Sequence, residues 1–380
     1  MEKLKLLYIV NEFIEASVNE LVLDLIRHLD PNAYQIYAGC VKQRRGGMQE
    51  AIRDAGAQIV SFRPGSAVLN IRRFIRQEQI DIVHTHVLRA DLIGGIATRL
   101  AGRGVLISTK HNFGYVSHQS GWLWRNLFYW PVMYLPDHLI FVNEVHRKRV
   151  TRLPFIKSHH VLSIPNGVDV DFFAMASGDR HVHREFNIED DITLVVYLGR
   201  LVRGKGLEAL IDAMQILKKG GQHLHLLIVG TGPLQHTLEH RIKSHHLNDY
   251  VTLTGYRSDI AEILSAADIF ALPSHSEGLP LSLLEAMAAG KAVVVTTVDG
   301  IIEVVHANET GVFVPLDSPT DLASALRQLA KDPRTRDRLG RAAQAFVREH
   351  YTNQRMTDAY DRLYRDCVAA PINQEGVLTR

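Results

Sequence analysis

Two carboxylates stand eight positions apart in an otherwise apolar stretch of the chain. Glu277 and Glu285 belong to SHSEGLPLSLLEAMAAGKAVVVT, residues 274–296. Pro280 and Gly290 predict a helix between them, because proline suits a first helical position and glycine suits a helix end. The first turn of such a helix has free N–H groups and is a ready site for an anion. Alternatively, both acids only cap the helix or form local ion pairs that stabilise its N-terminus.

A pair of basic residues lies in a second candidate segment, GRLVRGKG, residues 199–206. Arg200 and Lys205 follow an apolar run and precede a helical pattern, so both side chains can converge on one anion. Arginine offers a planar fork to phosphate oxygens, and lysine offers a mobile point charge. Backbone N–H groups from about Gly278 to Ser282 would face the same anion, and a diphosphate fits this arrangement. The alternative is a solvated basic turn.

Other nucleotide and metal motifs have less support. GTGP at residues 230–233 looks like a nucleotide-binding glycine turn, but two glycines are weak evidence for ligand contact. The chain has no Walker lysine followed by serine or threonine, no full G-x-G-x-x-G and no H-E-x-x-H. Dinucleotide, ATPase and zinc-hydrolase interpretations therefore lose support.

Short apolar runs alternate with helical patterns along the whole chain, which is typical of parallel sheets with crossover helices. The expected strands are residues 4–10, 34–40, 57–62, 81–86, 105–109, 138–142, 192–199, 224–230, 251–255, 268–273, 291–296 and 311–315. We therefore expect an α/β protein of two Rossmann-like, doubly wound parallel-sheet domains. Ligands of such sheets bind at the carboxyl ends of the strands. Two sheets that face each other would thus form a central cleft lined by the segments above.

A domain boundary is expected where this alternation stops. Residues 163–191 lose the periodicity and gain charge, glycine and asparagine, as a linker does. We place the boundary near residue 175. The predicted organisation is an N-terminal domain over 1–175, a C-terminal domain over 176–360, and a helix end with a loose tail over 361–380.

Composition limits the classes of protein. The 380 residues are 46% hydrophobic and carry a formal net charge of +2, which suits buried cores and does not indicate nucleic-acid binding. Positive charge gathers in residues 1–171, with 21 Lys and Arg against 15 Asp and Glu. Cys40 and Cys367 are too few for a disulfide framework or zinc cluster, which favours a reducing compartment. No apolar run approaches the roughly 20 residues of a spanning helix. We expect a cytoplasmic protein, with any membrane contact peripheral and at the inner face of the cell membrane.

The order of the motifs resembles the retaining family-4 glycosyltransferases of the GT-B fold, the glycosyl transferases group 1. In the back half the resemblance rests on GRLVRGKG, LLIVGTGP, LTGYRSDIAEILSAADIFALPS, SEGLPLSLLEAMAAGKAVVVT, DGIIEVV and TGVFVP. In the front half DIVHTH, STKHN, NEVHRKRV and IPNGVD are similar to that family's landmarks. The resemblance covers nearly the whole chain, and the E-x7-E element that it includes is specific to this family. It implies a GT-B fold whose N-terminal domain takes the acceptor and whose C-terminal domain binds the nucleotide sugar.

The resemblance also implies roles for the acids and bases named above. Arg200 and Lys205 match the family's basic pair that binds the nucleotide diphosphate, and we count them among the catalytic residues. Glu285 matches the second acid of E-x7-E, on the nucleotide ribose. Glu277 matches the first acid, near the donor sugar, and is a catalytic candidate.

Further site residues follow from the same resemblance. Gly278 and Leu279 would offer backbone N–H groups to the phosphates or the sugar. His111, in STKHN, matches a front-domain histidine that faces the donor sugar, and it is the remaining catalytic candidate. The alternative for His111 is a histidine satisfied at a strand end, and that structural interpretation is favoured for His84 and His86 in HTH.

One departure from the family pattern concerns the loop after the first strand. The family has a glycine pair there, followed by a small residue and glutamate, whereas this chain has Ser17, Val18, Asn19 and Glu20. Side chains at Ser17 and Val18 restrict the backbone and crowd a phosphate or acceptor. We therefore carry over only the position of Glu20, as part of a helix start, and a different acceptor geometry or a weakened activity is an open alternative.

The reaction implied by the resemblance is sugar transfer with retention. The acceptor hydroxyl attacks the face that the leaving diphosphate vacates, a phosphate oxygen serves as base, and protein groups position and stabilise charge. The donor would be a UDP- or GDP-sugar, and the acceptor a glycan or lipid-linked molecule of cell-envelope polysaccharide or glycolipid biosynthesis. No tightly bound cofactor and no metal are implied. The alternatives are a nucleotide-sugar epimerase or hydrolase, and a non-catalytic GT-B binding subunit.

An aromatic segment is the last feature of note. GWLWRNLFYWPVMYLP, residues 121–136, contains all three tryptophans of the chain, from Trp122 to Trp130. With Arg125 inside it and HRKR at 146–149 downstream, it suits either an amphipathic helix at an anionic membrane surface or an aromatic helix packed on the front sheet. The positive charge of the front half favours contact with a membrane or a lipid acceptor.

Overall fold

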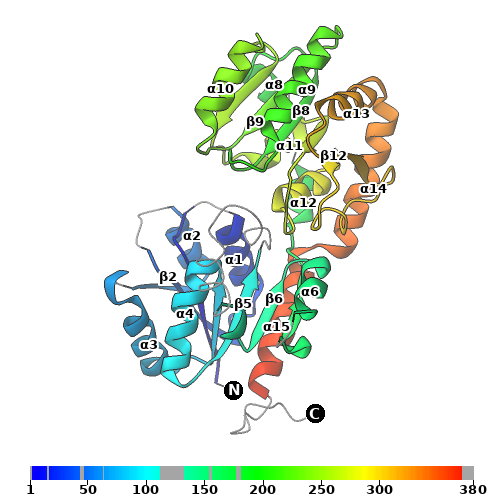
Figure 1. Ribbon diagram of the computed structural model, residues 1–380. Coiled ribbons are helices and arrows are strands. Elements are labelled where there is room, and N and C mark those ends of the chain that lie inside the picture. Colours follow the sequence, from blue (N-terminus) through cyan, green and yellow to red (C-terminus); the bar gives the residue numbers. More distant parts are fainter. Residues whose placement is uncertain are drawn as a thin grey trace. The chain divides into compact units, whose positions relative to one another are not determined.

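The chain divides into two compact units (Figure 1). The computed structural model describes residues 2–14, 17–42, 47–62, 64–111, 132–153, 156–176 and 181–369. Unit 1 consists of Met1–Asn166 and Asn353–Arg380, and unit 2 consists of Gly167–Thr352. The sequence places the change of domain near residue 175 and has the second domain run to 360. In the structure the chain returns to unit 1 at Asn353, because the last helix packs on the sheet of unit 1.

Unit 1 is built on a parallel sheet. Within the described residues it has seven strands in the order β3-β2-β1-β4-β5-β6-β7, every neighbouring pair parallel. Its strands are β1 (Leu4–Val10), β2 (Tyr34–Cys40), β3 (Gln58–Ser61), β4 (Ile82–His86), β5 (Val105–Lys110), β6 (His138–Phe141) and β7 (Val161–Ser163). The strand order reverses between β1 and β4, which is where sheets of this kind open a crevice at their carboxyl ends.

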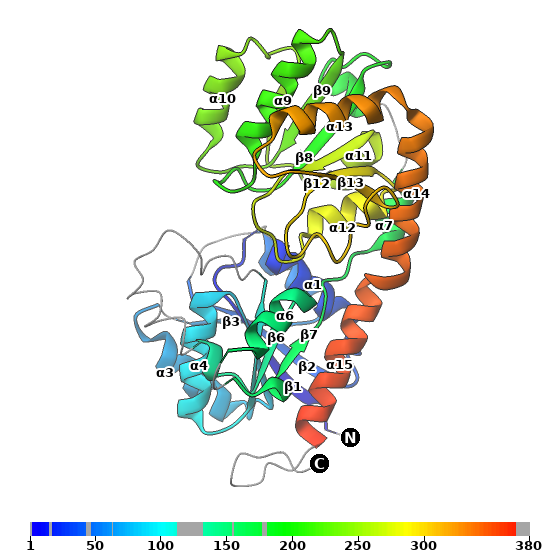
Figure 2. The same cartoon turned by 45° about the vertical axis from the view of Figure 1, so that its right-hand side comes forward.

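Helices connect and cover these strands. In the described part of unit 1 they are α1 (Ser17–His28), α2 (Met48–Asp54), α3 (Ala67–Gln77), α4 (Leu88–Ala101), α6 (Glu144–Thr151) and α15 (Asn353–Ala369), with short 3-10 turns at Pro64–Ser66 and Ser158–His160. α3 and α4 lie side by side, and α1 packs against α15 (Figures 1 and 2).

Opposite faces of this sheet bury different side chains, because side chains alternate along a strand. Ile9 and Thr85 face α4, which approaches so closely that a Cβ on Gly94 would lie 2.8 Å from Thr85 Cγ2. Tyr8 and His84 point to the other face, which α15 covers. The sheet is therefore wound on both sides.

α15 is tied to the sheet by a buried chain of hydroxyl and imidazole groups. Tyr364 Oη lies 3.1 Å from Tyr8 Oη and 2.7 Å from His84 Nδ1. His84 Nε2 lies 2.8 Å from Thr109 Oγ1, which lies 2.9 Å from Tyr360 Oη. Burial, with a smaller contribution from His111, lowers the pKa of His84 to about 3, so that its ring is neutral. This network explains why the C-terminal helix belongs to unit 1.

A buried ion pair fixes the end of β5 on the α4 side. Lys110 Nζ lies 2.5 Å from Asp91 Oδ2, and the hydroxyls of Thr85 and Ser108 each donate to Asp91 Oδ1 at 2.6 Å. Lys110 is 7% exposed and Asp91 is 3% exposed. Burial lowers the pKa of Lys110, and the carboxylate of Asp91 opposes that shift. The pair thus holds the backbone that leads directly into His111.

Unit 2 repeats the architecture. Within the described residues its sheet has six parallel strands in the order β10-β9-β8-β11-β12-β13. They are β8 (Thr193–Leu198), β9 (Leu224–Val229), β10 (Val251–Gly255), β11 (Ile269–Leu272), β12 (Ala292–Thr296) and β13 (Gly311–Val314). Its helices are α7 (Val170–Met175), α8 (His181–Glu185), α9 (Leu207–Lys219), α10 (Gln235–Ser244), α11 (Ile260–Ala266), α12 (Leu281–Ala288), α13 (Pro319–Lys331) and α14 (Pro333–His350).

The predicted fold class is confirmed: the chain is α/β, with two Rossmann-like parallel sheets. Each of the twelve expected strands coincides with a strand of the structure to within a few residues. β7 was not expected, because three residues are too short a run to show a pattern. The expected linker over 163–191 contains α7 and α8, two helices of six and five residues.

The buried pair gives a test of how unit 1 is held together. Asp91→Ala should lower the free energy of unfolding by about 3–5 kcal/mol, because it leaves the ammonium of Lys110 buried without a counter-charge. Asp91→Ala combined with Lys110→Met removes both charges and should recover more than half of that loss. Asp337→Ala, which breaks a solvent-exposed pair with Arg341, is the control and should change little. A double variant as unstable as Asp91→Ala alone, in urea unfolding, would show that lost packing and not the charge is responsible.

Candidate functional site

The loops that follow β8 and β9 in unit 2 are joined to each other by backbone hydrogen bonds. Leu201 N donates to Thr231 O at 2.9 Å, and Leu234 N donates to Leu201 O at 3.0 Å. A Cβ on Gly230 would lie 2.0 Å from Gly199 O, and one on Gly232 would lie 2.4 Å from Leu201 O. The glycines of GTGP therefore permit loop-to-loop packing, and this close approach accounts for them without ligand contact.

The same loop is held on its other side by the segment after β11. His275 N donates to Gly204 O at 2.8 Å. Gly206 has φ +69°, and a Cβ there would lie 2.0 Å from Pro273 O. Only glycine fits this position, because a side chain would collide with a backbone carbonyl that cannot move. The loop over 199–206 is thus clamped between two strand ends.

This clamp brings together the two charged groups that the sequence singled out as partners of one ligand. Lys205 Nζ lies 2.6 Å from Glu277 Oε1, a charge-assisted contact between residues 72 positions apart. The Glu277 side chain is 7% exposed and that of Lys205 is 24% exposed. A buried carboxylate needs a nearby cation, so Lys205 determines where the carboxylate of Glu277 can lie.

Two residues that sequence reasoning missed support this pair. Tyr197 is fully buried, and its hydroxyl donates to the carbonyl oxygen of Arg200 at 3.2 Å. Its pKa is raised by burial and further by the charge of Glu277, whereas the charge of Arg200 lowers it. Arg200 and Glu277 are therefore both near Tyr197. The signal was present in the tyrosine at the end of an otherwise aliphatic strand.

Gly300 is the second missed residue. A Cβ at this position would lie 1.5 Å from Gly278 O and 2.9 Å from Glu277 O. The backbone around Gly300 therefore presses directly on the backbone that carries the first acid. The signal in the sequence is a glycine that stands between two apolar runs at the start of DGIIEVV, which indicates a close backbone approach.

α12 follows this segment as the sequence predicts. Pro280 is the N-cap, the helix runs from Leu281 to Ala288, and Gly290 has φ +71° just beyond the end. Leu283 and Leu284 are fully buried, and they anchor the helix. Gly278 and Leu279 lie buried immediately before the helix, and Glu285 lies half-buried on it.

Arg200 differs from Lys205 in its environment. It is exposed, whereas Lys205 is half-buried and paired. Among the described residues no hydrogen bond or ion pair engages its guanidinium. The structure thus joins Lys205 to Glu277 directly, brings Arg200 near them through Tyr197, and carries Glu285 on the adjoining helix.

The candidate residue of unit 1 is His111, at the carboxyl end of β5. Its Nε2 lies 3.0 Å from His86 Nδ1, and the two rings are stacked with centroids 5.3 Å apart. Burial, followed by the charge of Lys110, lowers the pKa of His111 to about 4. The ring is therefore neutral at physiological pH, and it can donate through one nitrogen and accept through the other.

His84 and His86 are buried, as the structural interpretation expects. The pKa of His86 is lowered well below its usual value by burial and by the neighbouring His84. His84 bonds to the α15 network, whereas His86 bonds to His111. His86 is thus a neighbour that orients the candidate residue, a role that the sequence did not suggest.

The side chain of Asn19 bonds to the described residues that follow β1, at a position where the family pattern has a small residue. Asn19 Nδ2 donates to Glu12 O at 2.8 Å and to Ile14 O at 2.6 Å, and Asn19 is 5% exposed. α1 begins at Ser17. The amide of Asn19 therefore holds the described part of this loop against the helix start.

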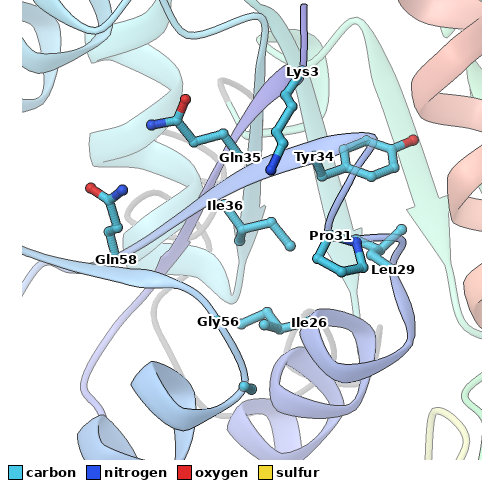
Figure 3. Close-up of a pocket in the computed structure, with 10 residues that line it drawn as sticks. Lys3, Ile26, Leu29, Pro31, Tyr34, Gln35, Ile36, Gly56 and Gln58 are labelled. Atoms are coloured by element: carbon cyan, nitrogen blue, oxygen red, sulfur yellow. The ribbon is translucent and has the colours of Figure 1, made fainter.

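A pocket of about 490 Å³ in unit 1 lies away from these residues. It is lined by Lys3, Tyr34, Gln35 and Gln58 around apolar side chains that include Ile36, and Lys3 lies between Gln35 and Tyr34 (Figure 3). These residues stand at the amino ends of the strands, the opposite edge from His111. Since parallel sheets bind their ligands at the carboxyl ends, the pocket is not the candidate active site.

The following two statements concern the part of the chain that the structure describes. No group of three or more His, Cys, Asp or Glu side chains there is arranged to hold a metal ion. No helix in that part has both the length and the apolar character needed to cross a membrane.

Two family models match the chain. Glycosyltransferase Family 4 matches residues 18–172, and Glycosyl transferases group 1 matches residues 179–346. A relative from Escherichia coli, the UDP-Gal:alpha-D-GlcNAc-diphosphoundecaprenol alpha-1,3-galactosyltransferase, is 26% identical over 275 residues, 70% of each chain. A Mycobacterium tuberculosis relative, the GDP-mannose-dependent alpha-(1-6)-phosphatidylinositol monomannoside mannosyltransferase, is 28% identical over 317 residues, 78% of this chain and 80% of that one.

Solved structures of low sequence identity share the fold. Anabaena Alr3699/HepE in complex with UDP-glucose has a TM-score of 0.84 at 17% identity, covering 95% of this chain and 99% of that chain. WaaG, a glycosyltransferase involved in lipopolysaccharide biosynthesis, has a TM-score of 0.76 at 14% identity, covering 94% and 99%. The two family models together match most of the chain, one in its front half and the other in its back half. The chain therefore belongs to the glycosyltransferases of the GT-B fold, with a family-4 front half and a group-1 back half.

Proposed function

We propose that the protein is a retaining glycosyltransferase that transfers a sugar from a UDP- or GDP-sugar to a glycan or lipid-linked acceptor of the cell envelope. The observation that carries the proposal is the ion pair between Lys205 and Glu277, set beside Arg200 and directly before α12. This arrangement places cations that can bind a diphosphate beside a carboxylate that can contact a sugar. Relatives named for UDP-Gal and GDP-mannose, and the HepE complex with UDP-glucose, support such a donor.

The diphosphate would bind between the basic loop and the N-terminus of α12. Arg200 would give a planar fork to phosphate oxygens, and Lys205 would give a point charge that also contacts Glu277. The N–H groups of Gly278 and Leu279 would be directed to the phosphates or the sugar. Glu285, one turn into α12, would accept hydrogen bonds from the ribose. The leaving diphosphate then departs with its charge already balanced.

Retention would place the acceptor hydroxyl on the face that the diphosphate leaves, with a phosphate oxygen taking the hydroxyl proton. In this scheme Glu277 stabilises the positive charge that develops at the sugar ring, and Lys205 holds that carboxylate in place. His111 would contact the donor sugar as a neutral ring that is oriented by His86. No tightly bound cofactor or metal is required by these steps.

The acceptor side of the proposal is a lipid-linked or glycan molecule, and we propose a cytoplasmic protein peripheral to an anionic membrane. The E. coli and M. tuberculosis relatives are named for lipid-linked acceptors. The aromatic segment 121–136, which the sequence offers as a membrane contact, lies largely outside the described residues, and so do Trp122 and Trp130. Ser17 and Val18, which stand where the family has a glycine pair, are the feature that favours an altered acceptor geometry or a binding-only subunit. Incubation of the protein with a candidate donor alone distinguishes a transferase from an epimerase or hydrolase, because the latter two convert the donor without an acceptor.

Removing the side chains of Arg200 and Lys205 should affect nucleotide affinity alike but melting temperature differently. Arg200→Ala and Lys205→Ala should each weaken binding of UDP or GDP about tenfold or more, because each loses a charge-assisted contact worth roughly 1.5–3 kcal/mol. Lys205→Ala should also lower the melting temperature, since it leaves Glu277 buried without its cation. Arg200→Ala should leave the melting temperature unchanged, because Arg200 is exposed. Calorimetric titration and thermal unfolding measure both, with the exposed Arg203→Ala as control; undiminished affinity in the first two variants would refute the diphosphate assignment.

The two acids should also separate kinetically. Glu277→Gln should lower kcat about tenfold or more and leave nucleotide diphosphate affinity nearly intact, if its contact forms chiefly in the transition state. Glu285→Gln should mainly weaken nucleotide binding, because it changes an acceptor for the ribose. Steady-state kinetics, nucleotide affinity and melting temperature are measured in parallel. Loss of stability alone in both variants would mean that the acids only support the start of α12.

The neutral state of His111 predicts a pH profile. Because its pKa is lowered to about 4, the ring stays neutral as the pH falls through 6.5 and becomes protonated only near pH 4. Wild-type kcat/KM should therefore show no inflection near pH 6.5 from this residue, whereas His111→Ala should lower kcat across the whole range. The exposed His236→Ala serves as control. An acid limb near pH 6.5 that disappears in His111→Ala would contradict the assignment.

A further inference from the structure

The two cations of the basic loop over 199–206 are held in place by different groups. Lys205 is held through its side chain, by the ion pair with Glu277. The guanidinium of Arg200 has no hydrogen bond or ion pair within the described residues, so the position from which it projects depends on its backbone. A group that fixes this backbone would therefore act on Arg200 and not on Lys205.

Most of the basic loop is tied to neighbouring segments by backbone hydrogen bonds. Leu201 is held at both its N–H and its carbonyl oxygen by the loop after β9, and Gly204 O accepts from His275 N. In the part of the chain that the structure describes, the backbone of Arg200 has no such bond to the backbone of another segment. Its carbonyl oxygen accepts from Val202 N at 3.0 Å, within the same turn. A tie from Arg200 to the sheet must therefore come from a side chain.

That side chain is Tyr197, which lies on β8. Its hydroxyl donates to Arg200 O at 3.2 Å, across three positions of the chain. A Cβ on Gly199 would lie 2.9 Å from the same hydroxyl oxygen, so the turn passes directly over it. The ring is fully buried, and a ring in a close-packed core has little freedom to move. β8 thus fixes the hydroxyl, and the hydroxyl holds the backbone of Arg200.

The hydroxyl of Tyr197 keeps its proton at physiological pH. Burial raises the pKa of Tyr197 and the charge of Glu277 raises it further, whereas the charge of Arg200 lowers it. A carbonyl oxygen can only accept, so the hydroxyl proton is directed to Arg200 O. The neutral phenol adds no negative charge beside the guanidinium. It can therefore hold the backbone without competing with a phosphate for the arginine.

We propose that Tyr197 is a positioning residue of the donor site, whose hydroxyl fixes the backbone of Arg200 so that the guanidinium meets the diphosphate at one place. A recognition group that is already in position loses less conformational freedom when the ligand binds, and affinity gains accordingly. The inference deepens the proposed function and rests on it, because the diphosphate is assigned to Arg200 there. Its effect is confined to the phosphates, since the hydroxyl acts through Arg200 alone.

The test begins with Tyr197→Phe in the full chain, which removes the hydroxyl and leaves the packed ring. The ligand is UDP or GDP, whichever the wild type binds more tightly, and its affinity should fall about threefold to tenfold, as for one lost hydrogen bond. Affinity for the matching nucleoside, uridine or guanosine, should stay within about twofold, because a nucleoside has no phosphate. Calorimetric titration measures both, with the nucleoside as competitor. Donor KM should rise by the same factor while kcat stays near the wild-type value.

A double-mutant cycle identifies the residue through which the hydroxyl acts. In the Arg200→Ala background, Tyr197→Phe should change nucleotide affinity by less than about twofold, because the group that it positions is already gone. In the Lys205→Ala background, the same substitution should weaken nucleotide binding by nearly the factor seen in the wild type, because Lys205 is positioned by Glu277 instead. A general disturbance of the site would lower affinity equally in both backgrounds.

Tyr351→Phe is the matched control. The hydroxyl of Tyr351 also donates to a backbone carbonyl in unit 2, that of Glu303, at 3.3 Å. Its removal should leave nucleotide affinity unchanged. Tyr197→Phe should melt within about 4 °C of the wild type, the shift expected from one lost hydrogen bond in a unit of this size, which shows that it is folded.

The outcomes separate this inference from the proposed function. Wild-type nucleotide affinity in Tyr197→Phe overturns the inference and leaves the proposed function standing. An undiminished loss of affinity in the Arg200→Ala background, or an equal loss of nucleoside affinity, also overturns the inference, because the hydroxyl would then act on the whole site. A wild type that binds neither UDP nor GDP, or that loses no affinity in Arg200→Ala, refutes the diphosphate assignment of the proposed function, and the inference fails with it.

Discussion

The carboxylate of Glu277 is almost fully removed from water, and such a group is tolerated only beside a cation. Lys205 supplies that cation from a loop 72 positions earlier. For the two to meet, the loop over 199–206 must lie against the segment after β11, and this contact needs glycine at 206. Gly300 in turn permits the segment after β12 to pack against the backbone of Glu277 and Gly278. These glycines and the buried Tyr197 thus support one arrangement, in which the acid and the lysine lie side by side.

The same pair determines what the site can do. A lysine that is already bonded to a carboxylate presents less net charge than a free one, so a diphosphate at this place would depend on Arg200 and on the N–H groups before α12 as well. The exposed Arg200 and the half-buried Lys205 are therefore unequal contributors. In the proposed function, Arg200 would be a recognition group whose loss costs the fold little, whereas Lys205 would serve both donor binding and stability.

The two faces of the sheet of unit 1 hold different groups of buried polar side chains. The α4 side holds the Asp91–Lys110 pair, and the α15 side holds the tyrosine and histidine network. His111 follows Lys110 directly, so its ring falls on the α15 side next to His86. Burial on that side keeps the rings neutral, and the ammonium of Lys110 across the sheet has the same effect on His111. α4 can approach the sheet closely because its inner face is small, and its large residues are consequently displayed outward.

The sequence by itself determined the two parallel sheets, the strand positions, the start and end of α12, and the set of acids and bases at strand ends. These follow from local patterns, since burial on both faces demands apolar runs and helix ends demand proline or glycine. Tertiary structure alone decided that Lys205 pairs with Glu277, that Tyr197 and Gly300 support them, and that His86 touches His111. It also decided that the C-terminal helix returns to unit 1, because the tyrosines of α15 find their partners on β1, β4 and β5. The hydrogen bonds that join His86 to His111, Lys205 to Glu277 and Tyr8 to Tyr364 span 25, 72 and 356 positions, and no local period of the chain records which distant side chains will meet.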